Sequence, residues 1–364
     1  MELTPRLELI DVGMDSNVFN EAEGARRDFT ATIRPSLDAG VRIGRARLVY
    51  RSRLDMVYFH DYKAERSMNR RAELRTELRL DRLVPYISVA GLDTRERPNN
   101  ELDLRARRST GTYRAGAALL VFARAALVFN AQRDALTYAP GQLFLGQDLA
   151  RQFNNRRDTL EGGFRIALTS LTTASFTGGR EQTRFTVSPD RNSDSVRAGA
   201  TFEFDPAALL TGTVAVNYRR FTPADESVAA FRGVVAQVNV RYVFQDRTWI
   251  AGQFARDIDY SVEDDQPYYL TTGGAVTLTQ RVGGPFDVQL RAGRERMAYR
   301  ARVGSALEIA GASRDTTDSL SAGIGYRFTQ VRIGVNYELT RRETHRVGQS
   351  YERRRILGAF SYGF

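Results

Sequence analysis

The last ten residues, 355 to 364, read RILGAFSYGF and indicate the fold of the whole chain. From Ile356 onward every second residue is apolar, aromatic or glycine, whereas Arg353 and Arg355 occupy the alternate positions just before it. A period of two is typical of a β-strand with two different faces. The apolar face ends in three aromatic residues, Phe360, Tyr362 and Phe364. We therefore expect a terminal strand with one face toward an apolar medium and the other toward water.

The same period recurs along the chain. The segment RAELRTELRL, residues 71 to 80, places leucines on one face and alternating Glu and Arg on the other. About eighteen such segments can be counted, within the even-numbered range of bacterial outer-membrane barrels. The expected strands start near residues 5, 27, 44, 69, 84, 108, 124, 157, 173, 194, 211, 230, 247, 267, 285, 316, 331 and 351.

The links between these segments alternate between short and long. Short links are expected around Gly40, Arg82, Ala123, Leu171, 205–210, Asp246, 283–285 and Gln330. Long polar links are expected at 14–26, 59–68, 93–107, 137–156, 186–193, 221–229, 259–266, 300–315 and 342–350. This alternation is typical of tight periplasmic turns at one rim and long extracellular loops at the other. We predict an all-β fold, a single closed antiparallel transmembrane barrel domain over residues 1–364 with roughly 16 to 20 strands.

The amino-acid composition and the lack of a long apolar run agree with a barrel in the bacterial outer membrane. The chain has 20 Phe, 16 Tyr and 30 Gly but no Cys, which excludes disulfides and thiolate chemistry. Its longest apolar run, 115–123, is far shorter than the roughly 18 residues that a membrane-spanning helix needs. A secretory signal is absent from the sequence, and we expect that it has been removed. Pro35, the one proline inside an expected strand, predicts a β-bulge.

If the apolar faces meet lipid, the arginine-bearing faces line the lumen. The predicted pore-lining residues are Arg34, Arg45, Arg47, Arg51, Arg53, Arg75, Arg79, Arg165, Arg197, Arg219, Arg241, Arg291, Arg332, Arg353 and Arg355. Acidic residues lie among them, so one interpretation is that ion pairs brace a water-filled wall. The other is that surplus positive charge, part of a net charge of +10, lowers the barrier for an anionic solute. The two interpretations are compatible.

A lumen of this width needs an inward-folded loop or a plug to be narrowed. The link 137–156 is the expected constriction because it is long and contains Leu143, Phe144 and Leu145.

Catalysis is not expected. The two histidines, His60 and His345, lie in expected external loops without a triad arrangement, and the acidic run from Asp257 to Asp265 matches no EF-hand spacing. We expect no catalytic residues, no metal site and no cofactor. Nucleic acid is not an expected partner, because the arginines are spread over one face of many strands instead of clustering.

The segment LELIDVGMDSNVFN, residues 7 to 20, resembles the first strand of the putative β-barrel porins associated with exopolysaccharide operons. Gly13, Asp15, Asn17, Val18 and Phe19 match that pattern, whereas Met14 stands where an aromatic is usual. The resemblance implies an outer-membrane conduit for an acidic polysaccharide, with an alginate-exporter-like barrel as the mechanistic analogy. The terminal Phe360, Tyr362 and Phe364 resemble the signal by which outer-membrane barrels are recognised for assembly.

Two functions remain open at this point. The first is a pore with an arginine-rich lumen for an anionic solute, with export of an acidic exopolysaccharide as its specific form. The second is a structural or interaction barrel, plugged by its loops or by a partner protein and without conductance. Expected partners are outer-membrane lipid and lipopolysaccharide, the barrel-assembly machinery, an anionic polysaccharide and a periplasmic polysaccharide-export protein.

Overall fold

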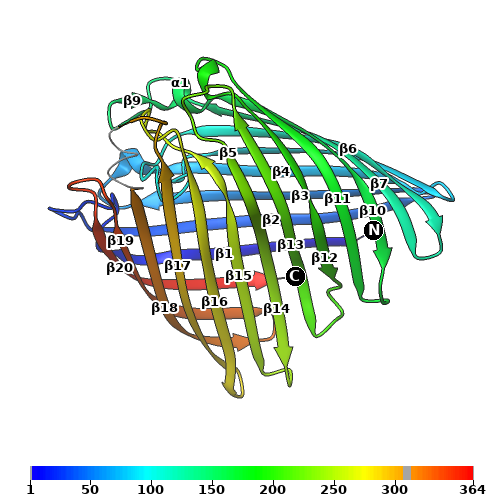
Figure 1. The fold of residues 1–364 in the computed structure, drawn as a ribbon. Helices are drawn as coiled ribbons and strands as arrows, with labels where there is room; N and C mark the ends of the chain where they lie inside the picture. The colour runs from blue at the N-terminus through cyan, green and yellow to red at the C-terminus, as the bar shows by residue number, and fades with distance from the viewer. Residues whose placement is uncertain (1, 306–312, 364) are drawn as a thin grey trace.

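The chain folds into one closed barrel. The computed structural model describes residues 2–305 and 313–363, and in these residues an 18-stranded antiparallel sheet closes on itself (Figure 1). Its strands are β1 (Glu2–Asp15), β2 (Asp28–Ile43), β3 (Ala46–Phe59), β4 (Ser67–Leu78), β5 (Leu83–Thr94), β6 (Arg108–Phe122), β7 (Ala125–Tyr138), β10 (Asn155–Ala167), β11 (Thr172–Phe185), β12 (Ser193–Phe204), β13 (Leu210–Pro223), β14 (Phe231–Phe244), β15 (Thr248–Tyr260), β16 (Tyr268–Gly283), β17 (Phe286–Arg300), β18 (Arg314–Phe328), β19 (Val331–Glu343) and β20 (Tyr351–Gly363). The predicted fold class and strand number are confirmed.

The remaining elements lie in the long loops. They are the short hairpin of β8 (Leu143–Phe144) and β9 (Gln147–Asp148), the helix α1 (Leu149–Phe153), and two 3-10 turns, η1 (Lys63–Glu65) and η2 (Pro189–Arg191). None of the helices formed by the described residues is long and apolar enough to cross a bilayer. Figure 1 shows α1 and β9 at one end of the barrel and both chain termini at the opposite end.

The two faces of each strand differ as the period of two requires. Residues directly opposite one another in an antiparallel pair point to the same side of the sheet, so the register assigns every strand position to the outside or the lumen. The outside is apolar, and its large side chains are exposed, as a lipid-facing surface must be. Examples are Ile87, Phe129, Phe176, Val216, Val276 and Ile356.

Short turns and long loops alternate between the two ends, as predicted. One boundary differs: the first short turn lies at Gly44 and Arg45, four residues beyond the expected Gly40, which is inside β2. Gly44 has a φ of 57°, a backbone conformation that glycine adopts without strain. The period of two continues through Gly40, so the sequence pattern could not separate the two glycines.

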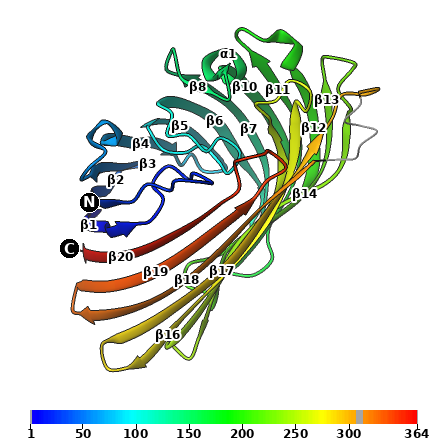
Figure 2. The same cartoon turned by 90° about the vertical axis from the view of Figure 1, so that its left-hand side faces the viewer.

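The barrel closes where β1 meets β20. The two strands pair from Arg6 opposite Gly363 to Asp15 opposite Arg355, and they lie side by side in blue and red in Figure 2. The segment that resembles the exopolysaccharide porins forms the extracellular end of this seam. The Asp15 carboxylate is buried and accepts hydrogen bonds from the Arg353 guanidinium and from the backbone N–H of Asn17 at 3.0 Å.

The other residues of the motif also make specific contacts next to this ion pair. A methyl group built on Gly13 would lie 1.9 Å from the carbonyl oxygen of Ile356, so only glycine allows β20 to approach. Val18 is buried, and the Phe19 ring packs edge-on against Tyr62 at 4.8 Å between centroids. The motif therefore seals the first strand to the last and anchors the first extracellular loop.

The predicted bulge at Pro35 is wrong. Pairing of β2 with β3 lapses between Ile33 and Ser36, but the register is the same on both sides of the gap. Proline lacks the N–H that the ladder needs, so a missing hydrogen bond is sufficient and no extra residue is inserted. The register shift lies instead in β1, between Ile10 and Gly13, where Asp11 has a φ of 53°.

The seam makes a direct prediction about Gly13. We expect Gly13→Ala to lower the free energy of unfolding by about 1–3 kcal/mol or more, because the added methyl group must displace the backbone of β20. The measurement is the temperature at which the compact, heat-modifiable band is lost in gel electrophoresis. Gly91→Ala is the matched control, since nothing lies within 4 Å of a methyl group at that position. Equal melting of the two variants would contradict this account of the seam.

Candidate functional site

The inner wall of the barrel is densely charged. The register places the predicted arginines of β2, β3, β4, β10, β12, β13, β14, β17, β19 and β20 on the lumenal face, and Arg79 follows directly after β4. Arg45 differs because it lies in the first periplasmic turn, where it is exposed and pairs with Asp81 at 3.4 Å. Arg45 therefore belongs to the rim and not to the wall.

Most of these arginines have an acidic partner within 4 Å. The pairs are Arg34–Asp55, Arg51–Glu73, Arg53–Asp55, Arg75–Glu77, Arg79–Glu77, Arg197–Glu181, Arg219–Glu181, Arg332–Asp287, Arg353–Asp15 and Arg355–Glu338. Arg219 is the most enclosed, with carboxylate oxygens of Glu181 and Asp257 at 2.7 and 2.6 Å. These ion pairs connect side chains along the inner face of the barrel. Apolar packing cannot stabilise that face, because it borders a water-filled lumen.

Four predicted pore-lining arginines have no carboxylate oxygen within 4 Å of their guanidinium nitrogens in the described part of the chain: Arg47, Arg165, Arg241 and Arg291. Arg291 donates to Thr277 and Gln253 at 3.2 and 3.1 Å, and Arg165 donates to Ser175 at 3.4 Å. Arg47 lies directly opposite Arg42 on β2 and Glu77 on β4, and the Glu77 carboxylate pairs with Arg75 and Arg79 instead. These arginines leave surplus positive charge on the wall, most of it toward the periplasmic ends of the strands.

The lumen is crossed by the loop that joins β5 to β6. Residues 95–107, called the strap below, leave the wall at β5 and reach the wall opposite. Asn99 Nδ2 donates to the Tyr269 hydroxyl at 3.2 Å, and Asn100 Nδ2 donates to Glu295 Oε1 at 2.7 Å. Seven strands separate β6 from β16 in one direction around the barrel, and seven separate β5 from β17 in the other. The strap therefore spans the full width of the lumen.

An internal turn gives the strap its shape. Asn99 Oδ1 accepts hydrogen bonds from the backbone N–H groups of Glu101 and Leu102 at 3.0 and 2.8 Å, which is the arrangement of an Asx turn. Asp103 then pairs with Arg97 at 2.6 Å and with Arg342 of β19 at 3.7 Å. These contacts hold the strap against β19 as well as against β16 and β17.

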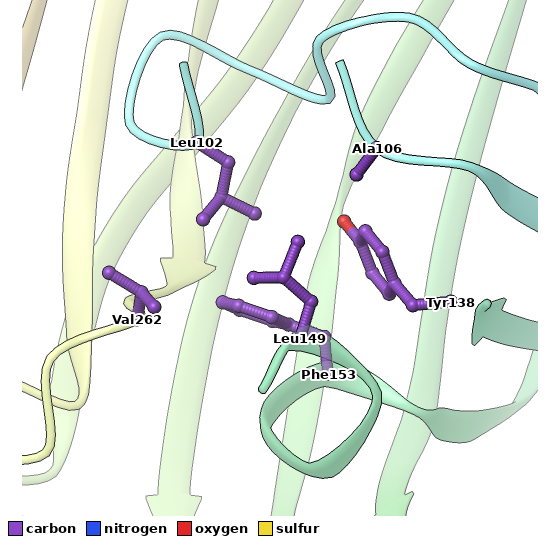
Figure 3. Packing of buried hydrophobic residues seen from close by; sticks show 6 residues of the cluster. All are labelled: Leu102, Ala106, Tyr138, Leu149, Phe153 and Val262. Atoms are coloured by element: carbon purple, nitrogen blue, oxygen red, sulfur yellow. The ribbon is translucent and has the colours of Figure 1, made fainter. Parts of the chain in front are cut away.

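A small apolar core lies beneath the strap. Leu102 and Ala106 of the strap pack with Tyr138, with Leu149 and Phe153 of α1, and with Val262 of the β15–β16 loop. Figure 3 shows these side chains converging from three loops and from the end of β7. Clusters of this kind resist water entry, so the strap is held by packing as well as by hydrogen bonds.

The loop predicted as the constriction lies beside the strap. Residues 137–156 fold into β8, β9 and α1, support the strap from one side and reach the β15–β16 loop, where Gln152 Nε2 donates to Asp264 Oδ1 at 3.2 Å. Leu143 and Leu145 are exposed, Phe144 only borders the core, and the residues that pack are Leu149 and Phe153. The strap was missed because it is mostly polar. The feature of the sequence that could have indicated the strap is the pair Asn99–Asn100, followed by two leucines in an otherwise charged loop.

Hydrogen bonds to a buried carboxylate connect the strap to the β15–β16 and β19–β20 loops. Glu101 is fully buried, and its carboxylate accepts hydrogen bonds from Ser261 Oγ at 2.7 Å and from Arg346 at 2.9 Å. Burial raises the pKa of Glu101 to about 7. Hydrogen bonds to Asp315 and Glu263 raise the pKa of His345 to about 9. His345 is therefore a cation at neutral pH, in an ion-pair network and not in a catalytic triad. His60 lies apart, exposed beside Asp61.

Two of the three terminal aromatics lie at the periplasmic end of the barrel. Phe360 and Tyr362 point outward from β20, whereas Phe364 is outside the described residues. Their role as an assembly signal stays a prediction.

Comparisons with known proteins agree with this architecture. The family model described as putative beta-barrel porin 2 matches residues 3–359. No curated protein sequence matches the chain. Among solved structures, Pseudomonas aeruginosa OccK2 (OpdF) in complex with glucuronate has a TM-score of 0.52 at 9% identity, covering 100% of this chain and 98% of that one. P. aeruginosa OpdQ has a TM-score of 0.51 at 10% identity, with 100% of both chains covered. Acinetobacter baumannii OccAB3 has a TM-score of 0.50 at 9% identity, also with full coverage. At sequence identities this low, the similarity to these three structures shows a shared fold only.

The network around Glu101 and His345 predicts a pH dependence. The raised pKa of His345 means that its contribution to holding the strap is complete below about 6.5 and is lost as pH rises through about 9. Burial of Glu101 favours its neutral form, and this contribution is lost earlier, as pH rises from about 4.5 to about 7. We expect hydrogen-exchange protection factors of residues 99–105 to fall between pH 6 and pH 9.5, while those of β10 stay constant. Unchanged protection in the strap would contradict this assignment.

Proposed function

This chain belongs to the putative beta-barrel porin 2 family, and we propose that it is an outer-membrane channel for anionic solutes that exports an acidic exopolysaccharide. One observation carries the proposal: Arg47, Arg165, Arg241 and Arg291 face the lumen without an acidic partner within the described residues. Rings of unpaired arginine lower the electrostatic barrier for anions and raise it for cations. The guanidinium fork also suits carboxylates in particular.

A polymer fits the distribution of charge better than a small ion does. The unpaired arginines come from β3, β10, β14 and β17, so they surround the lumen and are not gathered at one point. A chain with a carboxylate on successive units could exchange one arginine for the next as it moves. Binding at each position is then weak enough to be released, which is what conduction requires.

A second function is favoured by the strap. Because the strap crosses the whole lumen and most wall arginines are already paired, the barrel would be a closed interaction module if the strap never moved. In that case purified protein would carry no current, and its role would lie in contacts with a periplasmic partner. The two functions therefore differ in a single electrical measurement.

The test is the reversal potential of the purified protein in a planar bilayer under a potassium chloride gradient. We expect anion-selective current that an acidic polysaccharide blocks. Replacing the four unpaired arginines by glutamine (R47Q/R165Q/R241Q/R291Q) should move the reversal potential toward zero, because their charge sets the selectivity. The matched control is the same set changed to lysine, which keeps the charge and should keep the sign. Cation-selective current, or no current after repeated insertions, would contradict the proposal.

A further inference from the structure

We propose that the periplasmic half of the lumen contains a subsite for one hexuronate unit of an acidic polysaccharide, centred on Trp249. The subsite rests on the proposed function and narrows it to a substrate class. It is a hollow of about 430 Å³ in the inner wall of β14 to β19. That volume lies in the range of ordinary small-ligand pockets.

Trp249 is the only tryptophan of the chain, and it faces the lumen opposite Thr279. The guanidinium of Arg241 lies 5.7 Å from its ring and that of Arg281 lies 5.0 Å away. Both arginines are exposed, and neither forms an ion pair within 4 Å in the described part of the chain; Arg281 lies directly opposite Asp287 in the β16–β17 pair. An aromatic surface flanked by two guanidinium groups without a close ion pair is unusual on a wall that otherwise pairs most of its charges.

The charge of the hollow favours a carboxylate. Asp287 is the acid that lines it, and this side chain is already held by Arg332, with the closest atoms 2.6 Å apart. Arg327 also lies at the hollow, 4.0 Å from the same carboxylate. One acid is therefore shared by two arginines before Arg241 and Arg281 are counted, so a bound carboxylate would meet uncompensated positive charge.

The remaining lining favours a sugar over a simple anion. Thr277, Thr279 and Gln289 offer hydroxyl and amide groups, and Gln289 Nε2 donates to Thr279 Oγ1 at 3.3 Å. These groups can exchange hydrogen bonds with sugar hydroxyls, while the apolar face of a pyranose ring packs on the indole. An inorganic anion would use the arginines but would leave the ring and the hydroxyls unused. A hexuronate uses all three.

The single tryptophan makes the test direct, because its fluorescence reports on this hollow alone. Tetragalacturonate is titrated into the full-length protein in detergent, with neutral maltotetraose as the control ligand. We expect a saturable change in emission with the uronate and none at the same concentration of the neutral sugar. R241Q/R281Q should weaken the apparent affinity by about tenfold or more, because two charge-assisted contacts are lost. R82Q/R124Q, which removes two charges from turns on the other side of the barrel, should change it less than about twofold.

The outcomes separate the subsite from the channel. No saturable emission change in a protein that still conducts anions would overturn the subsite and leave the proposed function standing. Emission changes that are identical in R241Q/R281Q and in the parent would also overturn it, since the ligand would then bind without these arginines. Failure of both the titration and the anion current would remove the proposed function together with the subsite.

The outer face carries a second cluster of charge that the lumen does not explain. On several strands the lipid-facing apolar run ends at an arginine on the extracellular side. We call these residues the arginine rim: Arg133, Arg220, Arg232, Arg256, Arg341 and Arg354. The periplasmic rim has aromatic residues in the equivalent places, among them Phe244, Phe286, Tyr326 and Phe360.

Arg220 and Arg232 are the strongest evidence for a ligand at the arginine rim. They lie directly opposite each other on β13 and β14, both are exposed, and within the described residues neither has an acidic partner. Like charges in directly opposed positions destabilise a sheet, and a bound anion would remove the repulsion. We infer that the arginine rim binds the phosphate groups of lipopolysaccharide in the outer leaflet.

The measurement is the unfolding temperature of the protein in detergent with added bisphosphorylated lipid A, dephosphorylated lipid A or phosphatidylglycerol. We expect the bisphosphorylated form to raise it most, and R220Q/R232Q to lose at least half of that rise while R82Q/R124Q keeps it. An equal rise in R220Q/R232Q and the parent would overturn the inference. An equal rise with phosphatidylglycerol would also overturn it, because any anionic lipid phosphate would then suffice.

Discussion

The structure depends on one constraint, which is that no backbone N–H or C=O group can remain unpaired in the hydrocarbon of a bilayer. A sheet meets this constraint only if its first and last strands pair. The seam between β1 and β20 is therefore the most demanding part of the molecule. Gly13 allows the two backbones to approach, and the buried ion pair of Asp15 with Arg353 fixes their register. The sequence motif at the start of the chain is explained by closure.

Closure also determines what the lumen must be. Lipid requires an apolar outer face, so the inner face receives the polar residues, and a barrel of eighteen strands encloses a wide aqueous space. Ion pairs between neighbouring strands stabilise the wall, while the unpaired arginines give the wall a surplus of positive charge. The strap then divides the space that the wall encloses. Passage through the barrel is thus governed by two separate features, the charge of the wall and the position of the strap.

The strands could be predicted from the sequence because a period of two is a local property. RAELRTELRL shows it within ten residues, and the inward position of Arg75 follows from the same pattern. The strap could not be found in this way. The contact between Asn100 and Glu295 joins residues 195 positions apart, and nothing local to either residue specifies the other. The choice of 137–156 as the constriction followed apolar content, whereas the strap is held mainly by an Asx turn and buried charges. The bulge at Asp11 was missed for a similar reason, since a positive φ at a non-glycine residue leaves no trace in the hydrophobic pattern.

The measurement that tests the central claim most directly is the single-channel conductance of a variant in which residues 97–105 of the strap are replaced by a short Gly-Ser link. The wall is unchanged in this variant, so the effect of the strap is isolated. The account predicts a severalfold rise in conductance with anion selectivity retained. A conductance equal to that of the parent would show that the strap does not limit passage. A loss of anion selectivity would show that the wall arginines do not set the sign of the current.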